Sequence, residues 1–396
     1  MTGNGISLRG LKPVPRVIRT DLAAASRKVQ RAAVVAALRT EHLSRSDLIV
    51  RLGVSSSLIT RLVRSLLNEG IVQENGAVSS GVGRPPVQLQ LNATHGHLIA
   101  VSCEGERLRV GLFNLHGVEL RVNTVTLGKR ILNIAIIRKS IDAVQRDAGV
   151  AAQQLLGIAF SVPGVVDART GVVSEAPDLS WKKPVPLREL LEKAYAVPVT
   201  VDNDVNLMVI AEFEDGGAVG IEDVIYLYLG RSGLGAGIIS GGRLTQGSNG
   251  AAGEIGIIPL CPADGSDHGI RVESKISESA IGLALQEQGL DPDPAPIPAL
   301  VLWAEKKNDS ACRIRSDVLD ALSHSILMLS AILDPAVVLL GGAARDLVEI
   351  DLCQMSERLA SERPAPPALV FAHLDSDAVL QAAQTRCWRR ILAGGI

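Results

Sequence analysis

From about residue 94 to the end, short apolar runs alternate with longer helical stretches, and this alternation restricts the fold more than any other feature of the chain. It is typical of layered α/β proteins, in which helices cover the faces of a sheet. The expected strands lie at 97–102, 107–114, 157–161, 198–201, 223–229, 235–239 and 337–340, and the expected helices at 187–196, 205–214 and 316–333. Hydrophobic residues make up 47% of the chain, which is enough for a large core, so we expect about two to three domains.

The overall charge of the chain hides an uneven distribution. The formal net charge is −2, but residues 1–90 hold 13 Lys and Arg against 5 Asp and Glu, whereas the remainder holds 27 against 37. A basic segment attached to an acidic one predicts a polyanionic partner for the basic segment alone. Residues 1–21 carry Arg9, Lys12 and Arg16 among others and are expected to form a flexible basic tail, with a DNA-tracking arm as the alternative.

Residues 44–72 have the pattern of a helix-turn-helix. A short helix capped by Ser44 or Ser46 ends near Leu52, Gly53 supplies the turn, and a second helix begins at the serines that follow. In a helix-turn-helix the second helix enters the major groove, where serines donate to phosphates and arginines reach phosphates or guanine edges. The alternative is a helical hairpin with a solvated arginine face. The DNA-contacting residues predicted here are Ser55, Ser56, Ser57, Thr60, Arg61 and Arg64.

A β-hairpin is expected directly after this pair of helices. Residues 70–73 begin a strand, 75–83 are rich in glycine and serine, and 87–91 alternate as a returning strand, which together predict a wing. Arg84, in the Gly-Arg-Pro-Pro sequence at the base of the wing, is predicted to enter the minor groove, where an arginine meets a strong negative potential. The alternative for this sequence is a rigid linker. We therefore expect a winged helix-turn-helix domain at 22–92.

Four segments of the remaining chain resemble one protein family. They are 159–181, 199–206, 228–256 and 334–342, and the most specific sequence among them is Gly-Ala-Ala-Gly-Glu-Ile-Gly after a glycine-rich strand pair. These segments resemble the ROK family of sugar kinases and sugar-responsive repressors. The resemblance implies an actin-like (ribonuclease H-like) α/β body of two lobes at 93–396, and the winged helix before it is similar to the domain that the repressor branch carries.

The resemblance also implies which residues would hold a sugar. Asn203 and Asp204 match the Asn-Asp pair whose aspartate is the base in the family's kinases, and Glu254 and Glu273 match its sugar-contacting glutamates. Converging carboxylates and amides suit a polyol, because each buried hydroxyl without a partner is costly. The alternative for Asp204 is an ordinary helix cap, and the alternative for the glutamates is a solvated surface.

One phosphate-binding turn of the family's kinases is altered in this chain. The kinases place an Asp-x-Gly-x-Thr turn between their first two strands, and Ser102, Glu104 and Glu106 stand at these three positions. Anionic side chains at this turn would repel a triphosphate. The second turn keeps its glycines at 230–235, and Gly341 and Gly342 are kept as well, but glycines there also serve ordinary strand-to-turn geometry. We therefore expect no catalysis, so that Asp204 is a vestigial base, and no cofactor.

The cysteines predict neither a metal site nor disulfides. Family members follow Gly-Glu-Ile-Gly with a histidine and a loop of three zinc-binding cysteines, whereas this chain has Ile257 followed by only Cys261 and His268. A closed zinc site needs about four nitrogen or sulfur ligands, so no metal is expected. Five scattered cysteines, an N-terminus unlike a signal peptide and apolar runs too short to cross a bilayer predict a cytoplasmic protein without membrane contact.

Together these observations predict a DNA-binding transcriptional regulator, with repression as the commonest mode in the resembled family. The expected partners are operator DNA and a sugar or sugar derivative that controls carbohydrate-related genes. We expect a homodimer or homotetramer, because one recognition helix reads only half of a palindromic site. The alternatives are an ATP-dependent sugar kinase with an accessory DNA-binding domain, and a regulator without a small-molecule ligand that acts through a protein partner.

Overall fold

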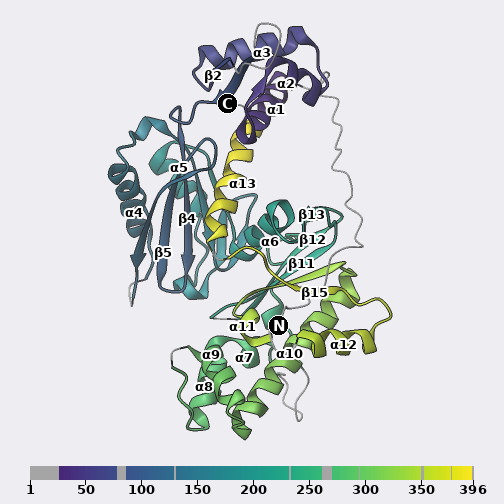
Figure 1. Ribbon diagram of the computed structural model, residues 1–396. Helices are drawn as coiled ribbons and strands as arrows, with labels where there is room; N and C mark the ends of the chain where they lie inside the picture. Colours follow the sequence, from purple (N-terminus) through teal and green to yellow (C-terminus); the bar gives the residue numbers. More distant parts are fainter. Residues whose placement is uncertain are drawn as a thin grey trace. The chain divides into compact units, whose positions relative to one another are not determined.

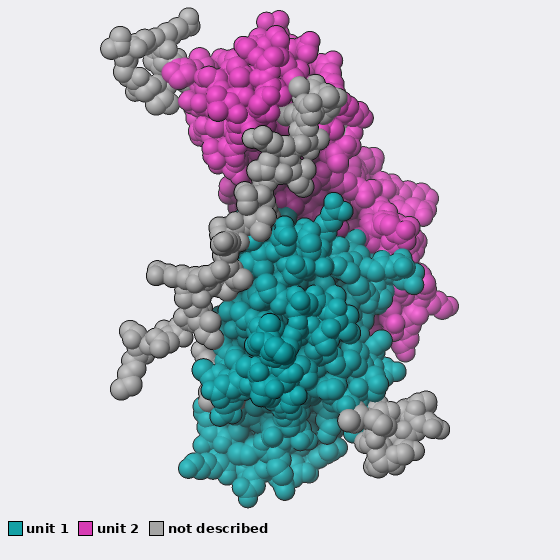
Figure 2. Space-filling model, turned by 90° about the vertical axis from the view of Figure 1, so that its right-hand side faces the viewer, with its two compact units in different colours: residues 1–16, 163–166, 203–379 teal, residues 17–162, 167–202, 380–396 magenta. Residues whose placement is uncertain are grey.

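The chain divides into two compact units, which Figure 2 colours separately. The computed structural model describes residues 26–77, 86–128, 131–231, 233–260, 270–293, 295–348, 352–375 and 377–394. Within these residues, unit 1 comprises 163–166 and 203–379, and unit 2 comprises 26–162, 167–202 and 380–394. The predicted tail at 1–21 lies outside the described residues.

Unit 2 holds a three-stranded sheet of order β1-β3-β2 and a five-stranded sheet of order β10-β7-β4-β5-β6 (Figure 1). Its strands are β1 Leu43–Ser44, β2 Val72–Ala77, β3 Val87–Leu91, β4 His97–Glu104, β5 Arg107–Asn114, β6 Glu119–Thr126, β7 Leu155–Val162, β9 Val172–Glu175 and β10 Val199–Asn203. The chain passes from unit 1 back into unit 2 within β8 Val165–Asp167. The helices of unit 2 are α1 Arg27–Thr40, α2 Arg45–Leu52, α3 Ser56–Asn68, α4 Ile134–Asp147, α5 Leu187–Tyr195 and most of α13 Ala378–Gly394.

The first three helices and the three-stranded sheet form the predicted winged helix. Ser44 rather than Ser46 caps α2, in a capping box in which the Asp47 carboxylate accepts from the Ser44 backbone. Gly53 ends α2 in a left-handed conformation, and Ser55 then caps α3 by accepting from the backbone N–H of Leu58. The local sequence therefore sets both ends of the turn that separates α2 from α3.

Unit 1 is built around a five-stranded sheet of order β13-β12-β11-β14-β15. Its strands are β11 Val224–Leu229, β12 Leu234–Ser240, β13 Arg243–Leu244, β14 Val337–Gly342 and β15 Ala368–Phe371. Its helices are α6 Asp204–Asp215, α7 Glu273–Ile276, α8 Glu278–Glu287, α9 Pro296–Glu305, α10 Asp309–Leu333, α11 Ala344–Val348 and α12 Leu352–Glu362. The helix expected at 316–333 begins earlier, because Asn308 caps α10 by accepting from the Ala311 N–H.

The two five-stranded sheets repeat one pattern. In unit 2, β4 pairs antiparallel with β5 and parallel with β7, and β5 pairs antiparallel with β6. In unit 1, β11 pairs antiparallel with β12 and parallel with β14, and β12 pairs antiparallel with β13. Helices lie between or after these strands, so the α/β class expected from the alternating sequence is present in both units.

Strand β11 separates two kinds of surroundings in unit 1. Ile225, Leu227 and Leu229 alternate along it and belong to the hydrophobic core that α7 to α12 complete. Tyr226 and Tyr228 alternate with them, so their side chains lie on the opposite face of the sheet. Helix α6 packs against β11 and β12. Unit 1 therefore has an apolar core on one face of β11 and two tyrosines on the other.

Helix α10 is the one helix in the described residues that is long and apolar enough to cross a membrane by length and composition alone. Its most apolar 18-residue window has a mean hydropathy of 1.3, and 44% of that window is buried within the structure. The helix packs against α7, α8, α9 and α12. A core helix of a globular protein meets the same criterion, so α10 is explained as the central helix of this bundle.

Candidate functional site

Helix α3 has one buried face and one exposed polar face. Its apolar side chains are Leu58, Ile59, Leu62, Val63 and Leu66, and all are buried. The predicted DNA-contacting residues of this helix are all exposed: Ser55, Ser56, Ser57, Thr60, Arg61 and Arg64. Within the described part of the chain, neither Arg61 nor Arg64 makes an ion pair or a side-chain hydrogen bond. The structure therefore leaves both guanidinium groups available to an outside partner.

A half-buried ion pair, not expected from the sequence, joins α1 to the end of α3. The guanidinium of Arg31, a residue that is only 9% exposed, donates to Glu69 Oε1 at 2.7 Å and to Ser65 Oγ at 2.9 Å. Ser65 Oγ also donates to Glu69 Oε1 at 2.7 Å. The hydrogen bond from Arg31 is the largest cause that lowers the pKa of Glu69 to about 2. This contact attaches the C-terminal end of α3 to α1.

The Glu69 contact predicts acid sensitivity. Because the folded pKa lies below the ordinary value of 4.5, the pair stabilises the fold above pH 4.5 and loses that effect as the pH falls toward 2. Because Glu69 is partly exposed and its charge is screened by solvent, Glu69→Gln should lower the free energy of unfolding by only about 1 kcal/mol at pH 7 and by less at pH 3, as measured by urea unfolding. The matched control is Glu74→Gln, since Glu74 pairs with Arg45 on the surface. Equal losses for Glu69→Gln at both pH values would contradict the assignment.

The predicted wing is present as far as the structure describes it. Strands β2 and β3 pair antiparallel, with Val72 opposite Leu91 and Ala77 opposite Val87. Asn75 donates to the Gln90 side chain at 3.1 Å across the two strands. Arg84 lies outside the described residues, so its minor-groove role stays a prediction.

The Asn203-Asp204 pair lies where β10 ends and α6 begins. The Asn203 side chain caps α6 by accepting from Asn206 N at 3.0 Å and donates to the Gly164 carbonyl at 3.0 Å. Asp204 is half-buried in the first turn of the helix, where its Oδ1 accepts from Val205 N at 2.9 Å. The capping role considered for Asp204 therefore belongs to Asn203, and Asp204 places a carboxylate at the helix start.

The Gly-Glu-Ile-Gly motif runs along strand β12. The Gly253 carbonyl accepts from Ala236 N at 2.9 Å, and Gly253 has a φ of 94°. A Cβ at this position would collide with the Ala236 carbonyl oxygen, so only glycine allows the approach. Glu254 follows directly and is half-buried. The close approach of Gly253 thus holds Glu254 beside β12.

Glu273 is brought to the same motif by helix α7. It is the first residue of α7, and its Oε2 would lie 3.1 Å from a Cβ added to Gly256. Arg271 lies 3.5 Å from the other carboxylate oxygen of Glu273. The start of α6 reaches the same strand, because Gly237 of β12 packs against Val205. All four predicted sugar-contacting residues therefore belong to unit 1, on segments that meet at or near β12.

Two tyrosines of β11 cover glycines for which the sequence allowed either a phosphate-binding turn or ordinary strand-to-turn geometry. The Tyr226 hydroxyl contacts Gly341, where any side chain would collide with it. The Tyr228 ring would lie 2.8 Å from a Cβ added to either Gly230 or Gly342. Burial, followed by the carboxylates of Glu212 and Asp204, raises the pKa of Tyr226, so its hydroxyl stays protonated. These glycines make room for tyrosine rings, a role that glycine spacing alone does not reveal.

The altered first turn joins β4 to β5. Gly105 and Glu106 form it, and Glu104 is opposite Arg107 in the antiparallel register. Ser102 is buried and Glu106 is exposed. The loss of phosphate binding at this turn stays a prediction.

The predicted lack of a zinc site concerns residues outside the described part of the chain. Cys261 and His268 both lie there. Among the residues that the structure does describe, no three or more His, Cys, Asp or Glu side chains are grouped to hold a metal ion.

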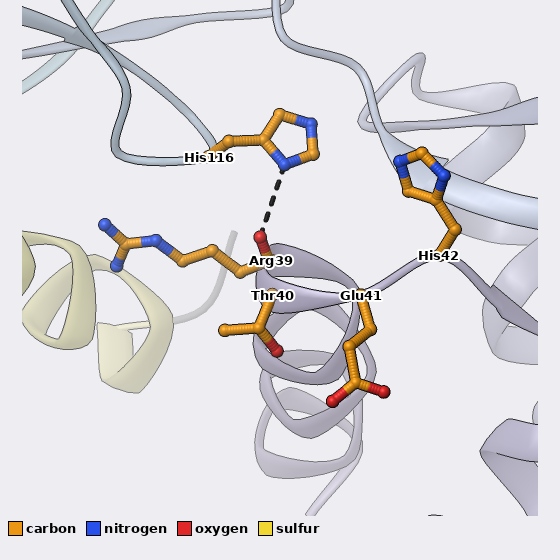
Figure 3. A pocket seen from close by; sticks show the side chains of 5 residues that line it. All are labelled: Arg39, Thr40, Glu41, His42 and His116. Carbon is orange, nitrogen blue, oxygen red and sulfur yellow. Dashed lines mark hydrogen bonds between the residues drawn. The ribbon is translucent and has the colours of Figure 1, made fainter. Parts of the chain in front are cut away.

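A pocket of about 450 Å³ lies in unit 2, where α1 ends beside the turn between β5 and β6 (Figure 3). It is lined by Arg39, Thr40, Glu41, His42 and His116. His116 Nδ1 lies 3.3 Å from the Arg39 carbonyl oxygen, and His116 Nε2 lies 3.1 Å from that of Leu91. The sequence did not single out these residues. His116 thus connects the turn after β5 to the end of α1 and to the end of β3.

Comparison with known proteins places these features in a family. A model described as the ROK family matches residues 98–385. The xylose repressor of Caldicellulosiruptor bescii is 27% identical over 338 residues, which cover 81% of this chain and 84% of that protein. The DNA-binding transcriptional dual regulator NagC of Escherichia coli (strain K12) is 25% identical over 366 residues, which cover 86% of this chain and 87% of NagC.

Solved structures share the fold. A ROK family transcriptional regulator, described as a homologue of the Escherichia coli MLC protein, has a TM-score of 0.75 at 22% identity and covers 93% of this chain and 97% of its own. The ROK hexokinase from Thermus thermophilus has a TM-score of 0.61 at 26% identity and covers 75% of this chain and all of its own. These likenesses confirm the fold class that the sequence predicted.

Proposed function

Because the chain belongs to the ROK family, we propose that it is a transcriptional regulator that binds operator DNA through α3 and a sugar or sugar derivative through unit 1. The observation that carries this proposal is the exposed face of α3, with Arg61 and Arg64 unpaired among the described residues. Relatives named as a xylose repressor and as a DNA-binding transcriptional dual regulator match more than four-fifths of the chain, which supports a regulator rather than a kinase.

The face of α3 suits both kinds of contact that a DNA-reading helix makes. Hydroxyl groups at its N-terminal end, on Ser55, Ser56 and Ser57, can donate to phosphates, and the helix dipole favours an anion there. Arg61 and Arg64 continue this face and can reach phosphates or guanine edges. One such helix reads half of a palindromic site, so we propose a homodimer or homotetramer on DNA.

The sugar site of the proposal consists of Asn203, Asp204, Glu254 and Glu273 in unit 1. Carboxylate oxygens accept from sugar hydroxyls, and three carboxylates with one amide match the many hydroxyls of a polyol. A sugar that binds one conformation better than another shifts the population between them, which changes the affinity for DNA. We propose repression released by sugar, in a cytoplasmic protein.

The test of this proposal begins with DNA. The protein should select a short set of related fragments from its source genome, and footprinting should show a palindromic site protected. Neighbouring carbohydrate genes would identify the sugar class to examine. Binding that shows no sequence preference at physiological salt would contradict the regulator proposal, because nonspecific binding needs only the positive charge of the winged helix.

Kinase activity is the alternative that the retained Asn203-Asp204 pair and the hexokinase likeness favour. We expect no phosphoryl transfer from ATP, because Tyr226 and Tyr228 cover the glycines at 341, 342 and 230, and Glu106 stands in the first turn. The measurement is a coupled assay of ADP release with glucose, xylose and N-acetylglucosamine. Turnover that Asp204→Asn abolishes would establish a kinase instead.

A further inference from the structure

A buried carboxylate directly before the Asn203-Asp204 pair is held by α13. Asp202, the last residue of unit 2 before the chain enters unit 1, has a side chain that is only 2% exposed. Arg386 of α13 pairs with it, with 2.5 Å between Arg386 Nε and Asp202 Oδ2. Removing a cation that pairs with a buried carboxylate is costly, so the pair constrains the end of β10.

The opposite face of α13 contacts the winged helix. The Arg39 guanidinium of α1 donates to Gln384 Oε1 at 2.9 Å and lies over the Trp388 ring, 5.5 Å from its centre. Gln381 donates to the Gly117 carbonyl at 3.1 Å. A Cβ on Gly117 would lie 2.6 Å from the Arg39 guanidinium, so glycine lets the β5–β6 turn approach this contact. Figure 3 shows the Arg39 side chain extending toward α13.

These two sets of contacts involve different sides of α13. Residues 384 and 386 are two positions apart, which places their side chains about 200° from one another around a helix. Gln384 is fully buried and faces α1, whereas Arg386 faces β10. Helix α13 therefore contacts α1 on one side and the strand that ends at Asn203 on the other.

The far end of α6 is attached to the segment that leads into α13. Glu212 of α6 is fully buried, and its Oε1 accepts from Leu374 N at 2.7 Å, between the end of β15 and the start of α13. Its Oε2 accepts from Gly217 N at 2.6 Å. Helix α6 is thus connected to the chain of α13 at both ends, through Asp202 before it and Glu212 near its C-terminus.

We propose that α13 transmits the state of the Asn203-Asp204 pair to α1, with Arg386 and Glu212 as positioning residues that attach this helix to the two ends of α6. A ligand that moves the first turn of α6 displaces the end of β10 and the Leu374 segment together. Helix α13 then shifts against Arg39 and changes the placement of α1. This inference rests on the proposed function, because that function supplies the sugar and the DNA whose binding α13 would couple. The coupling between α6 and α1 through α13 can nevertheless be tested without sugar or DNA.

Hydrogen exchange of the full-length protein tests the connection. Arg386→Ala should raise exchange in the last turn of α1, at residues 37–40, by about fivefold or more, the lower end of ordinary coupling between sites. Arg39→Ala, on the other side of α13, should raise exchange at residues 204–208 of α6, because coupling is reciprocal. Arg386→Lys keeps the cation beside Asp202 and should restore the native rates.

The matched control is Arg390→Ala, one turn further along α13. Arg390 is half-exposed and lies 3.9 Å from Glu192, so its loss should leave exchange in α1 and α6 within about twofold of the native rates. Urea unfolding midpoints separate a local effect from general destabilisation. Changes confined to β10 and α13 in Arg386→Ala, together with an unchanged α6 in Arg39→Ala, would overturn the inference. Failure of the proposed function would appear separately, as an absence of operator binding by the native protein.

Discussion

The double variant Arg61→Ala, Arg64→Ala is expected to bind operator DNA at least about 30-fold more weakly than the native protein, since each lost base or phosphate contact costs about 1–3 kcal/mol. Both arginines are exposed on α3 and make no ion pair within the described residues. Their replacement therefore removes contacts with DNA without breaking contacts within the protein.

Fluorescence anisotropy at several salt concentrations measures this loss of DNA affinity and separates the part due to phosphate contacts from the part due to base contacts. An arginine that contacts phosphate lowers the salt slope by about 1 when it is removed, whereas one that reads a base relaxes the sequence preference. The control is the double variant Arg121→Ala, Arg169→Ala, which removes the same charge from surface pairs with Asp147 and Asp167. Operator affinity that falls equally in both double variants would show that α3 is not the reading helix.

Asp204→Asn is expected to abolish sugar binding, with at least about a 100-fold loss of affinity, because a site built to accept from hydroxyls discriminates strongly once a partner is missing. In the native protein, a sugar at about 100 times its Kd should add about 2.7 kcal/mol of stability. Thermal unfolding with xylose, glucose and N-acetylglucosamine measures this gain, which Asp204→Asn should lose.

The control for this variant lies at the other end of the same helix. Asp215 is the last residue of α6 and is exposed, so Asp215→Asn should keep the full stabilisation by sugar. A native protein that no sugar of a broad panel stabilises would favour a regulator that acts through a protein partner. Equal losses in Asp204→Asn and Asp215→Asn would place the site elsewhere.

The parts of the fold that depend on local chemistry could be predicted from the sequence. The turn between α2 and α3 was expected because Gly53 and Ser55 are residues whose own conformations and hydrogen bonds end one helix and begin the next. The apolar residues of α3 recur at helical spacing in the sequence, and in the structure they form its buried face. The Asn203-Asp204 pair was found through family resemblance, and the structure added that Asn203 is the cap.

The parts that depend on distant partners could not be predicted. In the sequence, Arg31 looks like an ordinary surface arginine. Only folding places Glu69, which is 38 positions away at the end of α3, against it. Nothing near Asp202 in the sequence indicates Arg386 as its partner. From the sequence, Gly341 was equally consistent with a phosphate-binding turn and with a close contact to a side chain. A glycine indicates that some group approaches the backbone closely, but only the structure shows that this group is Tyr226.

The most direct test of a sugar-responsive regulator is operator affinity measured with and without the sugar that stabilises the protein. We expect at least about a fivefold change in Kd for DNA in the native protein, and the same factor for sugar affinity with and without DNA, because linkage is reciprocal. Asp204→Asn should bind operator normally and show no change with sugar. A sugar that binds the native protein yet leaves its operator affinity unaltered would show that the protein is not a sugar-responsive regulator.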